Sequence, residues 1–122
     1  MNYFDKAKDI HDMLANGKIF EAFDKYYHND VEMVEATGES RKGKDMNRKF
    51  QEEFMGMIKE IHGTGVKSIA SNEKEATTMV ESWMDVTYKD GQRQFMEEVA
   101  VQNWKGDQII HERFYYNGSL PL

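Results

Sequence analysis

The 122-residue sequence contains no cysteine and a single proline. The absence of cysteine excludes disulfide bonds and thiolate chemistry, and it is typical of a protein in a reducing compartment. Apolar residues nowhere run for the roughly 18 positions that a membrane-spanning helix needs. The polar start of the chain does not resemble a signal peptide. We therefore expect a cytoplasmic protein with no membrane partner.

Positive charge is also scarce. The chain has 16 Lys and Arg against 22 Asp and Glu, which gives a net charge of −6. Because affinity for nucleic acids depends on basic contacts to phosphates, this balance argues against a nucleic-acid partner. A glycine-rich phosphate loop is missing, and the four histidines show no metal-ligand spacing. We expect neither a cofactor nor a metal.

The sequence does contain a pattern of helices followed by strands. Apolar residues at helical spacing predict two short helices within residues 1–27 and a longer one from Lys44 to Ile61. Alternating patterns predict strands at residues 31–36 and 66–71, a hairpin over 76–104, and a last strand over 109–116. Residues 118–122 read as a loose tail. The order predicts one α+β domain over residues 1–122, with helices packed on a curved, mostly antiparallel sheet around a conical cavity.

The hairpin carries the most specific signal. Asp90-Gly91 is typical of a two-residue turn, and counting outward from it places Glu97 opposite Met84. Opposed residues share a face of the sheet, so Glu97 becomes the lone carboxylate on an apolar face. The other members of that face are Val80, Met84, Val86, Phe95, Val99 and Val101. A lone carboxylate there means either that the predicted register is wrong or that Glu97 belongs to a functional site.

The face of the last strand that lines the cavity depends on the turn around Gly106. A turn of three residues would direct one set of side chains into the cavity, namely His111, Arg113 and Tyr115. A turn of even length would direct the other set there, namely Glu112, Phe114 and Tyr116. Both alternatives remain open from the residues alone.

Three stretches of the chain resemble the nuclear transport factor 2-like superfamily, in its SnoaL-like and ketosteroid-isomerase-like branch. They are Asn16-Gly17 with the following run to Val31, the loop from Gly38 to Asp45, and the segment from Trp104 to Tyr116. The resemblance covers nearly the whole chain. It implies a cone-shaped α+β barrel with a small-molecule pocket at its open end.

In ketosteroid isomerases an aspartate after the first strand moves the proton, while a helix tyrosine and a protonated aspartic acid hold the oxyanion. The resemblance places Glu35 at or beside the base, and Glu97 or Glu98 near the late acid. The predicted register favours Glu97. Ile10 stands where the tyrosine should be, with His11 beside it, so steroid isomerisation itself is not expected.

Our first hypothesis is therefore a pocket protein that acts as a cofactor-free isomerase, dehydratase or cyclase on a small lipophilic cyclic molecule. Glu35 and Glu97 would be its proton-transfer pair, because burial raises the pKa of a carboxyl group toward neutrality. The predicted ligand-binding residues are His11, Tyr27, Met33, Phe54, Val99 and Tyr115. The alternative is a non-catalytic ligand-binding or dimeric interaction module, with Glu35 paired to Arg41 or Lys42 and Glu97 paired to Arg113.

Relatives of this fold commonly dimerise through the outer face of the sheet. The hairpin face opposite Glu97 carries two tryptophans, Trp83 and Trp104. Two tryptophans are more than a solvated face normally presents. We predict a homodimer with both at its interface.

Overall fold

The computed structural model describes residues 1–117, so the tail predicted at 118–122 lies outside the described residues. Three helices and six strands follow one another in the order α1 (Tyr3–Ala15), α2 (Ile19–Tyr26), β1 (Tyr27–Val34), β2 (Ser40–Lys42), α3 (Lys44–Gly56), β3 (Ile58–Asn72), β4 (Thr77–Tyr88), β5 (Arg93–Lys105) and β6 (Gln108–Tyr115). The predicted α+β class is confirmed. None of these helices is long and apolar enough to cross a membrane.

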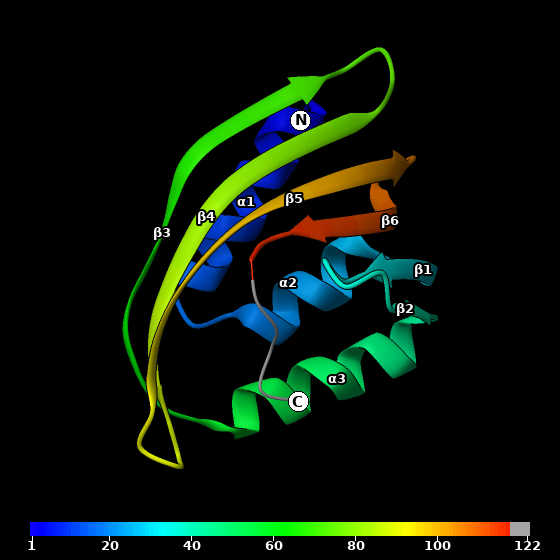
Figure 1. Cartoon of the computed structure of the whole chain (residues 1–122). Helices are drawn as coiled ribbons and strands as arrows, with labels where there is room; N and C mark the ends of the chain where they lie inside the picture. Colours follow the sequence, from blue (N-terminus) through cyan, green and yellow to red (C-terminus); the bar gives the residue numbers. More distant parts are fainter. Residues whose placement is uncertain (118–122) are drawn as a thin grey trace.

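One curved sheet organises the molecule, with strand order β2-β1-β6-β5-β4-β3. Neighbouring strands are antiparallel except for β1 and β6, which run parallel. Figure 1 shows the long strands β3, β4 and β5 bending around the helices, so that the helices lie on the concave side. This arrangement is the cone that the sequence predicts. We call the concave side the inner face and the convex side the outer face.

The third helix is shorter than predicted, because residues 58–61 belong to a strand. Ile58 pairs with Tyr88, and Ile61 pairs with Val86 on β4. Pairing with the 12-residue β4 satisfies the backbone groups of this segment, and its isoleucines favour a strand. The predicted strand at 66–71 is thus the second half of the 15-residue β3.

The predicted register of the β4–β5 hairpin is wrong by one residue. The Tyr88 N–H donates to the Gln92 carbonyl at 2.8 Å, and the Gly91 N–H donates to the Tyr88 carbonyl at 2.9 Å. The loop therefore has three residues and ends at Gly91 with φ +92°, the left-handed position that such loops require. Glu97 lies opposite Trp83, and Glu98 lies opposite Ser82.

A shift of one residue exchanges the two faces of β5, because side chains alternate along a strand. Glu98 takes the inner-face position predicted for Glu97. Glu97 and Val99 lie on the outer face, so their predicted places in the cavity are wrong.

Trp104 is the second correction that follows from this shift. Its side chain is buried, packs against the rings of Tyr3 and Tyr26, and donates to the Thr78 hydroxyl at 2.9 Å. It therefore belongs to the core beneath the first helices and not to the outer face. Trp83 does lie on the outer face, where its ring stacks on Phe95 with centroids 5.7 Å apart.

The turn before the last strand has the even length of the second alternative, since Lys105 pairs with Gln108 across two residues. With the corrected register of β5, this turn alone would set His111 opposite Gln102. The pairing shifts by one residue between Asn103 and Trp104, so Glu112 lies opposite Gln102 instead and is on the inner face. Tyr115 pairs with Val99 and is 51% exposed, so its predicted place in the pocket is wrong.

Candidate functional site

A cavity of about 210 Å³ lies between the inner face of the sheet and the helices. Most of the residues in its wall are apolar, among them Phe23, Phe50, Phe54, Phe114, Met84 and Met96. Methionine side chains adapt to ligands of different shape. Five of the predicted site residues line this cavity: His11, Tyr27, Met33, Glu35 and Phe54.

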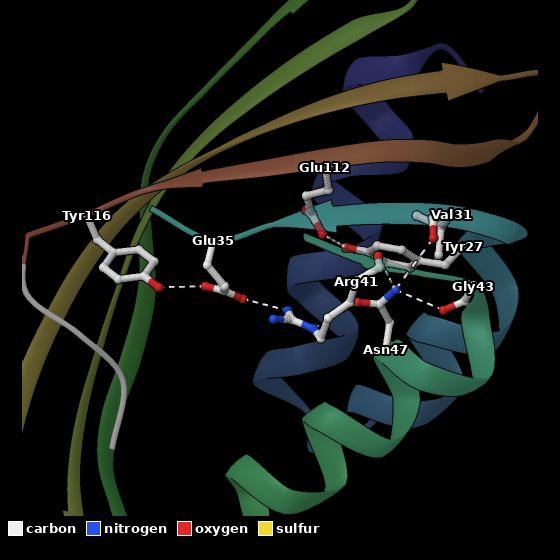
Figure 2. Close-up of polar contacts among 8 residues, drawn as sticks. All are labelled: Tyr27, Val31, Glu35, Arg41, Gly43, Asn47, Glu112 and Tyr116. Atoms are coloured by element: carbon white, nitrogen blue, oxygen red, sulfur yellow. Dashed lines mark hydrogen bonds and ion pairs between the residues drawn. The ribbon is translucent and has the colours of Figure 1, made fainter. Parts of the chain in front are cut away.

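Glu35 is held from two sides. One carboxylate oxygen accepts a hydrogen bond from Arg41 Nη2 at 2.6 Å, and the other accepts from the Tyr116 hydroxyl at 2.6 Å. Figure 2 shows the three side chains in one line across the site. Burial of the hydroxyl and its bond to Glu35 raise the pKa of Tyr116. The pairing of Glu35 with Arg41 is the one that the non-catalytic alternative predicted.

Arg41 is itself fixed by the start of α3. Its Nε donates to Asn47 Oδ1 at 3.2 Å, and its guanidinium carbon lies 3.5 Å from the centre of the Phe50 ring. Asn47 is completely buried, and its amide nitrogen donates to the carbonyls of Gly43 and Arg41 at 2.8 and 3.0 Å. Asn47 therefore joins the loop, the helix and the guanidinium into one rigid unit (Figure 2).

Glu112 forms the centre of a second polar group. Its two oxygens accept from the Tyr27 hydroxyl and from the Gln102 amide, both at 2.7 Å. Gln102 in turn accepts from Thr78 at 2.8 Å. Burial raises the pKa of Glu112 to about 7, against the lowering effect of those two donors. Because its oxygens are already satisfied, Glu112 orients its neighbours rather than a ligand.

Glu98 differs from both of these acids. It lines the cavity, and among residues 1–117 the structure records no hydrogen bond or ion pair to its carboxyl group. Burial, together with the nearby charges of Glu112 and Glu35, raises its pKa to about 7. The sequence offered Glu98 as one of two candidates for this position, and the wrong register led to the other.

Glu97 lies on the far side of the same strand. Its side chain is 50% exposed and forms an ion pair with Lys67, not with Arg113. It takes no part in the cavity.

His11 belongs to α1 and lines the cavity. Burial lowers its pKa, so its imidazole is neutral at neutral pH. Within the described residues, His, Cys, Asp and Glu nowhere gather in a group of three that could hold a metal ion. The chemistry available from the cavity wall is therefore proton transfer by Glu98 and hydrogen bonding from Arg41 and His11.

The sequence model of the SnoaL-like domain matches residues 3–116. A candidate SnoaL-like polyketide cyclase from Mesorhizobium loti is similar in structure, with 30% identity and a TM-score of 0.83 over 95% of this chain and 100% of that one. A candidate isomerase from Bacillus subtilis shares the fold at 13% identity, with a TM-score of 0.80 over 96% and 90% of the two chains. So does a candidate polyketide cyclase from Pseudomonas putida, at 16% identity and a TM-score of 0.80 over 96% and 92%. No protein with curated functional information matches the chain.

Proposed function

Since the chain belongs to the SnoaL-like family, we propose that its cavity binds a small lipophilic cyclic molecule and that Glu98 transfers a proton on it, without a cofactor. The reaction class is isomerisation, dehydration or aldol-type cyclisation. Each of these needs a group that removes a proton at one atom and returns it at another. Solved structures of similar fold include candidate cyclases and a candidate isomerase, which is consistent with this class.

One observation carries the proposal: Glu98 is an acid in an apolar cavity with no protein partner among the described residues. A carboxyl group with a pKa near 7 suits this role at neutral pH. A large fraction of it is ionised, and the carboxylate is a stronger base than one with an ordinary pKa. Glu35 is less suited to the role, because both of its oxygens already accept hydrogen bonds. We assign Glu35 a positioning role through Arg41.

The test uses 5-nitrobenzisoxazole, a probe whose isoxazole ring opens when a base removes the proton from C3, the one C–H of that ring. The electron pair of that C–H bond forms the nitrile, the N–O bond breaks, and a coloured nitrophenolate is released. We expect the wild-type protein to accelerate this reaction, with a rate that rises as the pH passes through about 7. Glu98→Gln should lower the rate by roughly a hundredfold or more, the usual contribution of a positioned base.

Glu97→Gln is the matched control, because it removes the same charge one residue away on the outer face. Its rate should stay within about twofold of wild type. Equal rates for the Glu98 variant and the wild-type protein would remove Glu98 from the mechanism. In that case the non-catalytic binding module is the better description, and a thermal-shift screen with steroids, aromatic polyketides and terpenoids would define its ligand.

We also propose that the chain forms a homodimer through the outer face of the sheet. Phe95 and Tyr115 are 55% and 51% exposed there, and Met79 is 40% exposed. This exposed apolar surface has side chains of both charge signs beside it, as in the Lys67–Glu97 pair. It could therefore pack against the same surface of a second copy, with opposite charges facing each other.

A further inference from the structure

We propose that Arg41 binds an anionic oxygen of the molecule in the cavity, and that this molecule is therefore a ketone or a phenol that ionises to an enolate or a phenolate. The inference deepens the proposed function and rests on it for the use of the cavity. It names the chemical class of the ligand and adds a residue that would contact it.

The argument begins with the donors of the guanidinium group, which carries five N–H bonds in a fixed plane. Nε donates to Asn47, and Nη2 donates to Glu35. Within residues 1–117 no acceptor is recorded for Nη1, and Arg41 belongs to the cavity wall. In Figure 2 the second terminal nitrogen of Arg41 carries no contact to the residues drawn. Both N–H bonds of Nη1 and the second N–H bond of Nη2 are thus left for a ligand.

The orientation of these donors is set before a ligand arrives. Phe50 packs against the plane of the guanidinium, Asn47 holds one edge, and Glu35 holds another. The Arg41 side chain is only 13% exposed. A donor held in this way does not have to reorganise when charge develops on the ligand, which is the condition for strong stabilisation of an oxyanion.

The other groups in the wall offer no equal alternative. The hydroxyl of Tyr27 donates to Glu112, and the imidazole of His11 is neutral because burial lowers its pKa. Arg41 is the one permanently cationic side chain in the lining of this cavity within the described residues. An anionic oxygen therefore gains most by lying against it.

The charges balance through the proposed step. Glu98 as a carboxylate takes a proton from the carbon beside the carbonyl group, and the electron pair of that C–H bond moves to the carbonyl oxygen. Glu98 becomes neutral while the oxygen becomes anionic, so the net charge of the cavity does not change. Before a ligand binds, Glu35 offsets the charge of Arg41.

The test measures binding rather than turnover, with 4-nitrophenolate as a stable mimic of the enolate and 4-nitrotoluene as a neutral match of similar shape. Arg41→Lys keeps a cation beside Glu35 but lacks the forked donors. We expect it to weaken 4-nitrophenolate binding roughly tenfold, as expected for a charged hydrogen bond, and to leave 4-nitrotoluene binding within about twofold. The absorbance of bound nitrophenol should also report a higher pKa for its hydroxyl in this variant than in the wild-type protein.

Glu35→Gln should change the affinity for 4-nitrophenolate in the opposite direction. Its amide oxygen can still accept from Arg41, but the charge of the guanidinium is no longer offset, so 4-nitrophenolate should bind at least about threefold more tightly. Arg93→Lys is the control, because Arg93 forms a similar pair with Asp85 at 2.9 and 3.0 Å on the outside of the molecule. It should change neither affinity.

Failure of 4-nitrophenolate to bind the wild-type protein, or an equal loss for both probes in Arg41→Lys, would overturn the inference. The outcome is separate from the test of Glu98. If Arg41 binds the phenolate but Glu98→Gln has no effect on benzisoxazole opening, the chain is a carrier of acidic phenols or ketones. If Glu98 is needed for benzisoxazole opening but Arg41 is not needed for phenolate binding, the proposed proton transfer is supported and the proposed ligand class is wrong.

Discussion

Glu97 and Glu98 are chemically identical neighbours in β5, yet the sheet gives them different surroundings. Glu97 points to the outer face, is half exposed, and pairs with Lys67. Glu98 points to the cavity, has no recorded partner among residues 1–117, and has its pKa raised to about 7 by burial. A shift of one residue along the strand therefore separates a surface charge from a candidate acid–base group.

The comparison extends to the whole of β5, because both of its faces carry apolar side chains. The inner face carries Met96 and Ala100, and the outer face carries Phe95, Val99 and Val101. Hydrophobicity alone thus suits either orientation of the strand. Placement of the acid depends on the register, so the most direct experiments are those that distinguish the two faces.

The largest effect is expected when a new carboxylate is placed on each face in turn. Ala100 is buried opposite Val80, so Ala100→Asp should cost more than about 3 kcal/mol in the free energy of unfolding. Val99→Asp on the outer face should cost about 1 kcal/mol. Urea denaturation measures both. If Val99→Asp were the more damaging change, the observed register would be wrong.

A second effect concerns the pH dependence of stability. Burial raises the pKa of Glu98 to about 7 from an ordinary 4.5, so the folded state holds a proton that the unfolded state loses. The stability contributed by this protonated group is fully present below about pH 4.5 and is lost as the pH rises through 7. Between these two pH values the free energy of unfolding of the wild-type protein should fall by about 3 kcal/mol through this group. Glu98→Gln should not show that part of the fall.

This expectation is tested by measuring the free energy of unfolding at about pH 5 and about pH 8, on either side of the titration of Glu98. Glu97→Gln serves as the control and should follow the wild-type curve. A Glu98 variant whose stability falls with pH as steeply as that of the wild-type protein would contradict a protonated acid in the cavity.

A third experiment tests the outer face as a dimer surface. Phe95→Glu places a charge beside Trp83 at the centre of the exposed apolar side chains. We expect the dissociation constant of the dimer to rise about tenfold or more, equivalent to about 1.4 kcal/mol. Analytical ultracentrifugation measures the change, with Phe4→Glu, on α1 and away from the outer face, as the control. A wild-type protein that stays monomeric at micromolar concentration would exclude the dimer.

The smallest effect is expected from the ion pair that holds Glu97. Lys67→Ala removes its partner, but both side chains are about half exposed, so solvent screens the interaction. The thermal midpoint should stay within about one degree of wild type. A larger fall would mean that Glu97 contributes to the fold in a way that its exposure does not suggest.

Much of the architecture could be predicted from local patterns. The helices of residues 1–27, the beginning of α3 at Lys44 and the strand around Met33 follow from apolar spacing. The end of α3 could not be predicted, because Met57 and Ile61 continue the helical spacing. Only the pairing of Ile58 and Ile61 with β4 shows that the segment is a strand.

The candidate site was predicted in part for a similar reason. The resemblance to ketosteroid isomerases places Glu35 at the candidate base, and its position in the cavity wall follows from β1. The sequence favours Glu97 over Glu98, because Asp90-Gly91 suits a two-residue turn as well as a three-residue loop with Gly91 in the left-handed region. Arg41 as a ligand-binding group could not be foreseen, because its direction depends on Phe50 and Asn47 from the next helix.

Local patterns are sufficient for the fold class, since the helical and alternating apolar periods belong to each segment separately. Which of two neighbouring glutamates enters the cavity depends on contacts between segments. The burial of Trp104 beneath Tyr3 and Tyr26, and the bond from Gln102 to Glu112, accompany one register of β5. These contacts join residues far apart in the chain, so no local pattern could select between Glu97 and Glu98.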